Sequence, residues 1–212
     1  MKIMRMMASA AALAGFVAAS ASASGAVLFD SLGTASAGAG HTGLGKILGA
    51  SFSTGSSSVI LGDVSVLIED VPSDGGTFQI SLLSDTSTSP GATLAASANL
   101  PDSDLSTSFT LQTVDFGTSL AANTRYWIQL SSTSATGIGW SYTNDFSGPG
   151  VANEFWDDDG VNPNSGGPYQ MEVSTSTAAT PEPSTWAMLL VGFAGLGYTA
   201  YNRSRKRRLA AL

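Results

Sequence analysis

The central part of the chain, residues 24–180, consists mainly of short segments in which apolar and polar residues alternate. A period of two places successive side chains on opposite faces of an extended strand, so one face can enter a core while the other meets water. β-Branched and aromatic residues favour such strands, and serine and threonine suit their exposed faces. The apolar series of five predicted strands are Val64, Val66 and Ile68; Phe78, Ile80 and Leu82; Phe109 and Leu111; Tyr126, Ile128 and Leu130; and Ile138, Trp140 and Tyr142.

Turn-forming residues separate the alternating segments. The sequence Ser-Asp-Gly-Gly at residues 73–76 predicts a hairpin between the strands on either side of it. The Gly/Ala/Ser-rich stretch Gly33–Gly45 is predicted to be a loop. Many short strands with frequent turns predict an all-β domain over residues 24–173. We expect an antiparallel two-sheet sandwich, jelly-roll-like or Ig-like, of about eight or nine strands.

The N-terminus has the three parts of a secretory signal peptide. Basic residues come first, residues 8–19 are mostly apolar, and the Ala/Ser sequence that follows offers small-residue cleavage sites. The apolar run is too short to cross a bilayer. We therefore expect signal peptidase to remove residues 1–23, cutting after Ala21 or Ala23. The alternative, an ordinary buried helix, leaves the cluster of small residues without a purpose.

Three features follow one another near the C-terminus, after a Ser/Thr-rich linker at residues 174–180. The first is the motif Pro181, Glu182 and Pro183, and the second is a mostly apolar run over residues 186–201. The third is a basic segment, which the positive-inside rule would keep in the cytoplasm, leaving the central region outside. Its basic residues are Arg203, Arg205, Lys206, Arg207 and Arg208.

The length of the apolar run bears on its role. At a rise of ~1.5 Å per residue it covers about 24 Å as a helix, which is short for a stable membrane span. Aromatic residues toward its two ends suit the two membrane interfaces. We therefore expect a transmembrane helix that holds the chain in the inner membrane for a time and is then removed; a permanent tail anchor is the alternative.

The order and spacing of these parts resemble the PEP-CTERM sorting signal, over residues 181–208. The resemblance implies recognition by an exosortase, a membrane cysteine protease, for which Pro181, Glu182 and Pro183 would be substrate residues. It also implies a Gram-negative-type bacterium that makes exopolysaccharide. The protein would pass through an inner-membrane intermediate and then reach the cell surface or the extracellular matrix.

The central domain is also similar to the bacterial surface group called choice-of-anchor R, whose domains precede interchangeable C-terminal anchors. That group has no established activity, so the resemblance implies surface display and no particular chemistry. It lies in five short segments: Leu48–Gly55, Gly76–Ile80, Thr124–Ile128, Gly139–Tyr142 and Gly167–Met171.

The composition disfavours several kinds of chemistry. The chain has no cysteine, and its single histidine, His41, would be the only base for a Ser-His-Asp triad. Lys46 and Arg125 are the only basic residues of residues 24–180, which hold all but one of the 16 acidic residues, so nucleic acid is not an expected partner. We therefore expect a non-enzymatic protein without a cofactor. Carboxylate pairs two residues apart leave a secreted glycan-active enzyme as a less favoured alternative.

The sequence offers candidate residues for two kinds of ligand, a calcium ion and a sugar. Asp157 and Asp159 lie in an acidic run whose oxygens suit Ca²⁺, although the spacing does not fit an EF-hand, and we favour a solvated acidic loop without metal. Trp127 is out of phase with the apolar series of its strand, and Trp156 lies in the acidic run, so both rings are candidates for stacking on sugars. A carbohydrate-binding module, with exopolysaccharide as its partner, is therefore the alternative function; for both rings we favour packing against a neighbouring strand or loop over stacking on a ligand.

Overall fold

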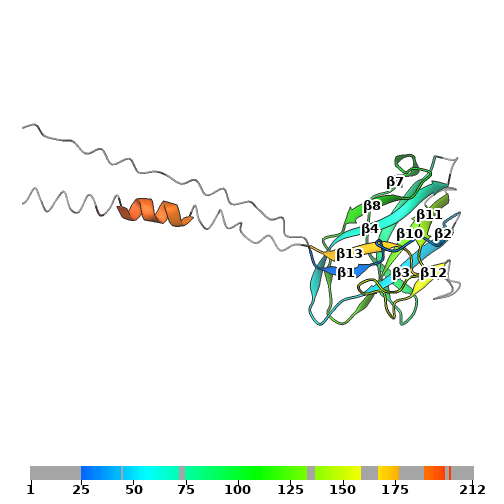
Figure 1. The fold of residues 1–212 in the computed structure, drawn as a ribbon, viewed down its shortest axis with the longest axis horizontal. Helices are drawn as coiled ribbons and strands as arrows, with labels where there is room; N and C mark the ends of the chain where they lie inside the picture. The colour runs from blue at the N-terminus through cyan, green and yellow to red at the C-terminus, as the bar shows by residue number, and fades with distance from the viewer. Residues whose placement is uncertain are drawn as a thin grey trace, which may run out of the picture. The chain divides into compact units, whose positions relative to one another are not determined.

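The computed structural model describes residues 25–43, 45–71, 75–132, 137–158, 167–176, 189–198 and 201. The chain divides into two compact units. One unit is Ser24–Thr177, called the β-domain below, and the other combines Met1–Ala23 with Ala178–Leu212. The described part of the β-domain contains thirteen strands, which form two sheets with antiparallel pairing throughout (Figure 1). The expected all-β, antiparallel class is therefore confirmed, with more strands than the eight or nine expected.

The two sheets take their strands from along the whole β-domain. A single turn of 3₁₀ helix, Asp102–Asp104, follows β7. The seven-stranded sheet contains β1 (Val27–Asp30), β2 (Gly38–His41), β4 (Val59–Val71), β8 (Thr110–Asp115), β9 (Ser119–Leu120), β11 (Gly137–Tyr142) and β13 (Met171–Thr175). The six-stranded sheet contains β3 (Ile47–Ser53), β5 (Thr77–Asp85), β6 (Pro90–Ala96), β7 (Leu100–Pro101), β10 (Arg125–Ser132) and β12 (Trp156–Asp158).

The core lies between the inner faces of the two sheets. Most of the alternating series point into it, because strands β4, β5, β10 and β11 each bury every second side chain there. In β8 the phase is the reverse of the prediction: Leu111 is 55% exposed and lies opposite Leu67, while Val114 packs against the core. β8 carries apolar residues in both phases, so alternation alone does not determine its inner face.

The predicted hairpin at residues 73–76 is wrong. β4 and β5, on either side of it, belong to different sheets and do not pair. The Asp102 carboxylate instead accepts a hydrogen bond from the Gly76 N–H at 2.6 Å, and the Asp102 N–H donates to the Gly76 carbonyl. Since Asp102 is buried and makes these bonds, its structural role is to fix the start of β5 against the 3₁₀ turn.

The predicted loop Gly33–Gly45 contains β2, which is also a departure from the expectation. β2 pairs with β11, and two aromatic rings cover its glycines. A Cβ atom at Gly40 would lie 2.3 Å from the phenol oxygen of Tyr169, and one at Gly38 would lie 2.8 Å from that of Tyr142. Glycine is therefore used here for close approach of the rings rather than for loop flexibility.

Gln170 joins three segments of the β-domain through a buried polar network. Its amide NH₂ donates to the Thr34 carbonyl at 2.8 Å and to the Ser31 carbonyl at 3.2 Å. Its amide oxygen accepts from the Ser141 hydroxyl at 2.5 Å, and its backbone carbonyl accepts from the Trp140 indole N–H at 3.0 Å. The residue is 1% exposed, so these bonds replace water for a fully buried side chain.

The first and last strands of the β-domain, β1 and β13, pair with each other (Figure 1). Ala26 exchanges hydrogen bonds with Thr175, and the Ser176 N–H donates to the Ile60 carbonyl. Ser174 and Thr175 therefore belong to a strand, so the linker predicted at residues 174–180 begins later than expected. The two ends of the β-domain consequently leave it side by side.

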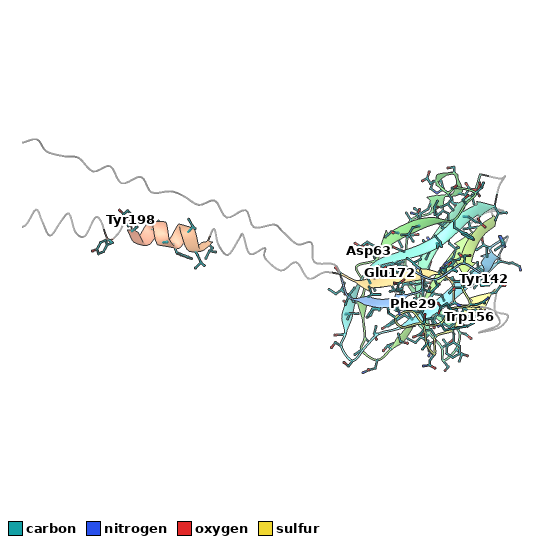
Figure 2. All side chains as sticks on the ribbon, in the orientation of Figure 1. Phe29, Asp63, Tyr142, Trp156, Glu172 and Tyr198 are labelled. Carbon is teal, nitrogen blue, oxygen red and sulfur yellow. The ribbon has the colours of Figure 1, made fainter. Side chains whose placement is uncertain are left out.

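The second unit is described only in part. Residues 189–198 form a short helix, and its apolar side chains, with Tyr198 near one end, are exposed (Figure 2). Among the described ranges, no helix combines the length and apolar character needed to cross a bilayer. The predicted signal peptide, the motif at Pro181 to Pro183 and the basic segment from Arg203 to Arg208 lie outside the described residues.

Candidate functional site

Trp127 points to the outer face of the six-stranded sheet, as its phase in the sequence indicates, but its ring is fully buried. It lies across from Leu83 on β5, and its indole N–H donates to the Asp85 carboxylate at 2.8 Å. The favoured interpretation, packing of the Trp127 ring, is therefore confirmed, and the alternative of a ring free to stack on a sugar is wrong. The ring is part of a small second core on the outside of the sheet.

Arg125 holds two loops over this outer face. Its Nε donates to the Glu154 carboxylate at 3.1 Å, and its two terminal nitrogens donate to the carbonyls of Ser87 and Asn153. The guanidinium group also lies 4.4 Å from the ring centre of Phe155. The Glu154 carboxylate is buried and accepts a second hydrogen bond, at 2.6 Å, from the Ser51 hydroxyl. All three nitrogens of the Arg125 guanidinium group therefore make hydrogen bonds within the β-domain, and its charge is paired with that of Glu154.

A hollow of about 480 Å³ lies beside these loops, with Leu83, Pro90, Gln129 and Asp157 among its lining residues. The hollow is shallow, its lining combines polar and apolar side chains, and no solvent-exposed aromatic ring borders it. Asp157 is buried and pairs through its backbone with Gly49, so it is not presented as a ligand on a loop. Asp159, the other calcium candidate, lies outside the described residues. In the ranges that the structure covers, no three acidic, histidine or cysteine side chains gather as a metal site would require.

Trp156 is also buried, at 7% exposure, and belongs to the core between the sheets. Packing, the favoured interpretation, is therefore confirmed for Trp156 as well, and the alternative of an exposed stacking ring is wrong. Its indole N–H has no hydrogen-bond partner among the described residues. The Trp156 ring contacts that of Phe146, with the two centroids 5.8 Å apart.

Phe146, which the sequence does not single out as a candidate ring, is an exposed aromatic residue of the β-domain. It is 49% exposed, and within the described β-domain no other aromatic side chain is exposed by more than about a third. It borders a hollow of about 440 Å³ together with Ser36, Thr143, Asn144 and Asp145. An exposed ring beside short polar side chains is the combination that stacking on a sugar would require at Trp127 or Trp156.

The segment around Phe146 is braced by its own side chains. The Asp145 N–H donates to the Thr143 hydroxyl at 3.0 Å, and the Ser147 N–H donates to the Asp145 carboxylate at 2.9 Å. Hydrogen bonding from the Ser147 side chain, and then from its backbone N–H, lowers the pKa of Asp145, so its carboxylate is ionised at neutral pH. The signal in the sequence was an aromatic residue inside a polar, turn-rich stretch.

His41 lies exposed on β2, opposite Gly139. No salt bridge to His41 is found in the part of the chain described, where the pair of Arg125 with Glu154 is the one ion pair. The geometry around His41 therefore does not resemble a hydroxyl–imidazole–carboxylate relay.

Tyr169 is a buried titratable group next to the acidic strand β12. Its ring stacks on Trp140 with centroids 4.8 Å apart. Burial raises the pKa of the Tyr169 phenol, and the nearby carboxylates of Asp158 and Asp157 raise it further.

This shift predicts a loss of stability in alkali. Above about pH 10 the unfolded chain loses the Tyr169 proton while the folded chain keeps it, so the free energy of unfolding falls by up to about 1.4 kcal/mol per pH unit. The stability that depends on the protonated Tyr169 phenol is fully present below the pKa of this phenol in the unfolded chain. It is lost as the pH rises toward the higher pKa in the folded chain. We expect Tyr169→Phe to flatten this decline in urea unfolding measured from about pH 9 to 11. Equal slopes for the two proteins would show that Tyr169 does not titrate in this way.

Comparison of the chain with models of known protein families, and with curated proteins, gives no match.

Proposed function

We propose that this is an exported, non-enzymatic protein of the bacterial cell surface or extracellular matrix, sorted by an exosortase and associated with exopolysaccharide. The observation that carries the proposal is the three-part C-terminal sequence: the Pro181 to Pro183 motif, the apolar run 186–201 and the basic segment. An N-terminal sequence typical of signal peptides supports the same route. Signal peptidase and exosortase would then be the processing partners, and the inner membrane a temporary site.

The boundaries of the β-domain support this assignment. The compact unit ends at Thr177, which precedes the motif, and begins at Ser24, which follows the proposed cleavage sites. Loss of both terminal segments would therefore leave the two sheets and their core complete. A domain of this kind suits display outside the cell after processing at both ends.

The connections of the β-domain bear on its finer fold class. The chain changes sheet between β2 and β3, β3 and β4, β4 and β5, and β7 and β8, and again at each step from β9 to β13. Frequent crossing between two antiparallel sheets favours a jelly-roll-like sandwich over an Ig-like one.

The sorting role is tested in the native host by deletion and by a motif variant. Removing residues 181–212 is expected to change the destination of the protein, because it removes all three parts of the signal. The double substitution Pro181→Ala with Glu182→Ala is expected to leave unprocessed chain in the inner-membrane fraction. Ser184→Ala, next to the motif, is the matched control and should be delivered normally. Normal delivery of both the deletion and the double variant would contradict the proposal.

A further inference from the structure

The Phe146 hollow, defined by Ala35–Ala37 and Thr143–Phe146, combines a partly exposed aromatic ring with adjacent polar side chains. The phenyl ring is half exposed and packs against the buried Trp156 ring in a tilted arrangement, with the ring centroids 5.8 Å apart. A ring fixed in this way offers flat apolar surface at little further cost in conformational entropy, because packing already restricts its rotamers.

Polar groups stand beside the ring. The Asn144 side chain is exposed and makes no hydrogen bond within the described residues, so its amide has both donors and an acceptor to offer. The Asp145 carboxylate, braced by Ser147, supplies acceptor oxygens. Few well-placed polar groups next to an apolar surface are what a small-ligand site requires.

The charge of the β-domain narrows the ligand class. Among residues 24–180 the only basic residues are Lys46 and Arg125, and Arg125 is already paired with Glu154. A polymer of uronic acids would be repelled by the surrounding carboxylates and would meet no free guanidinium group. Neutral sugars escape this penalty.

We propose that the Phe146 hollow binds a neutral hexopyranose unit of a polysaccharide. The C–H face of the sugar ring stacks on the phenyl ring of Phe146, while Asn144 and Asp145 hydrogen-bond to its hydroxyl groups. The proposal rests on the proposed function only in taking a polysaccharide as the ligand. A sugar site at Phe146 stands or falls independently of how the protein is sorted.

The test is affinity electrophoresis of the full chain, purified in a zwitterionic detergent that lacks a sugar headgroup. Native gels contain dextran, hydroxyethyl cellulose, galactomannan or, as the polyuronate, alginate. We expect retardation by at least one of the three neutral polymers and none by alginate. Phe146→Ala is expected to weaken binding at least about tenfold, equivalent to about 1.4 kcal/mol. Asn144→Ala is expected to weaken it as well, and Phe146→Tyr to retain it.

Leu94→Ala is the matched control, because Leu94 is equally exposed, at 48%, but lies on β6 away from the hollow. The thermal midpoint of each variant shows whether it is folded, and Asn144→Ala removes no packing, so it remains informative if Phe146→Ala is unstable. The proposal is overturned if no neutral polymer retards the natural chain, if alginate alone does so, or if folded Phe146→Ala and Asn144→Ala variants bind as well as Leu94→Ala. None of these results depends on exosortase or on the C-terminal motif.

Discussion

Replacing Gln170 with leucine is expected to lower the free energy of unfolding of the β-domain by about 3 kcal/mol. The two side chains have similar volume, so the change removes hydrogen bonds without opening a large cavity. It leaves the Thr34 carbonyl without its side-chain donor, and it leaves the Ser141 hydroxyl with only the Ser36 hydroxyl as a side-chain partner. Unsatisfied buried groups cost more than the net value of the bonds that are lost.

The measurement is urea unfolding of the full chain, with Gln112→Leu as the control. Gln112 lies on β8, is only half-buried, and makes no side-chain hydrogen bond within the described residues. We expect its substitution to change the free energy of unfolding by less than about 0.5 kcal/mol. Equal effects of the two substitutions would show that the Gln170 network contributes little.

Replacing Arg125 with methionine is the second change with a large expected effect, a loss of about 2 to 3 kcal/mol. The substitution keeps an apolar stem but leaves the buried Glu154 carboxylate with only the Ser51 hydroxyl as its side-chain partner. It also frees the carbonyls of Ser87 and Asn153, so both loops lose their attachment to β10. The Arg125 side chain is 25% exposed, which places the expected loss below that of a fully buried pair.

Arg125→Lys separates charge from geometry. A lysine ammonium keeps the positive charge but lacks the planar fork that reaches Glu154 and two loop carbonyls at once. We therefore expect Arg125→Lys to recover less than half of the lost stability. Lys46→Met, at an exposed position, is the control for loss of a charge and should have little effect. Full recovery by lysine would mean that charge alone explains the role of Arg125.

The sequence predicts the strands better than it predicts their partners. Alternation identifies the inner faces of β4, β5, β10 and β11, because a buried face requires apolar residues at every second position. It does not say which strands pair, and the predicted hairpin at residues 73–76 is wrong for this reason: β4 and β5, on either side of it, lie in different sheets. The glycines of β2 were misassigned because the covering rings, Tyr142 and Tyr169, come from distant parts of the chain.

The candidate site shows the same limit. The phase of Trp127 in its strand indicates the face to which the side chain points. It does not indicate that two loops, hydrogen-bonded to Arg125, lie over that face. Trp156 was expected in a loop and instead begins a strand that packs into the core. Phe146, by contrast, lies outside every alternating series, and what distinguishes it is its exposure in the folded domain. Exposure depends on tertiary contacts, which a single sequence does not contain.

The central claim, that both terminal segments are removed on the way to the cell surface, is tested most directly by mass spectrometry of the mature protein. The protein is isolated from the surface and matrix fractions of its native host and its two ends are determined. We predict an N-terminus that follows Ala21 or Ala23, and the absence of the apolar run 186–201 and the basic segment beyond it. An intact chain, with residues 1–212 recovered from the cytosol, would contradict the account.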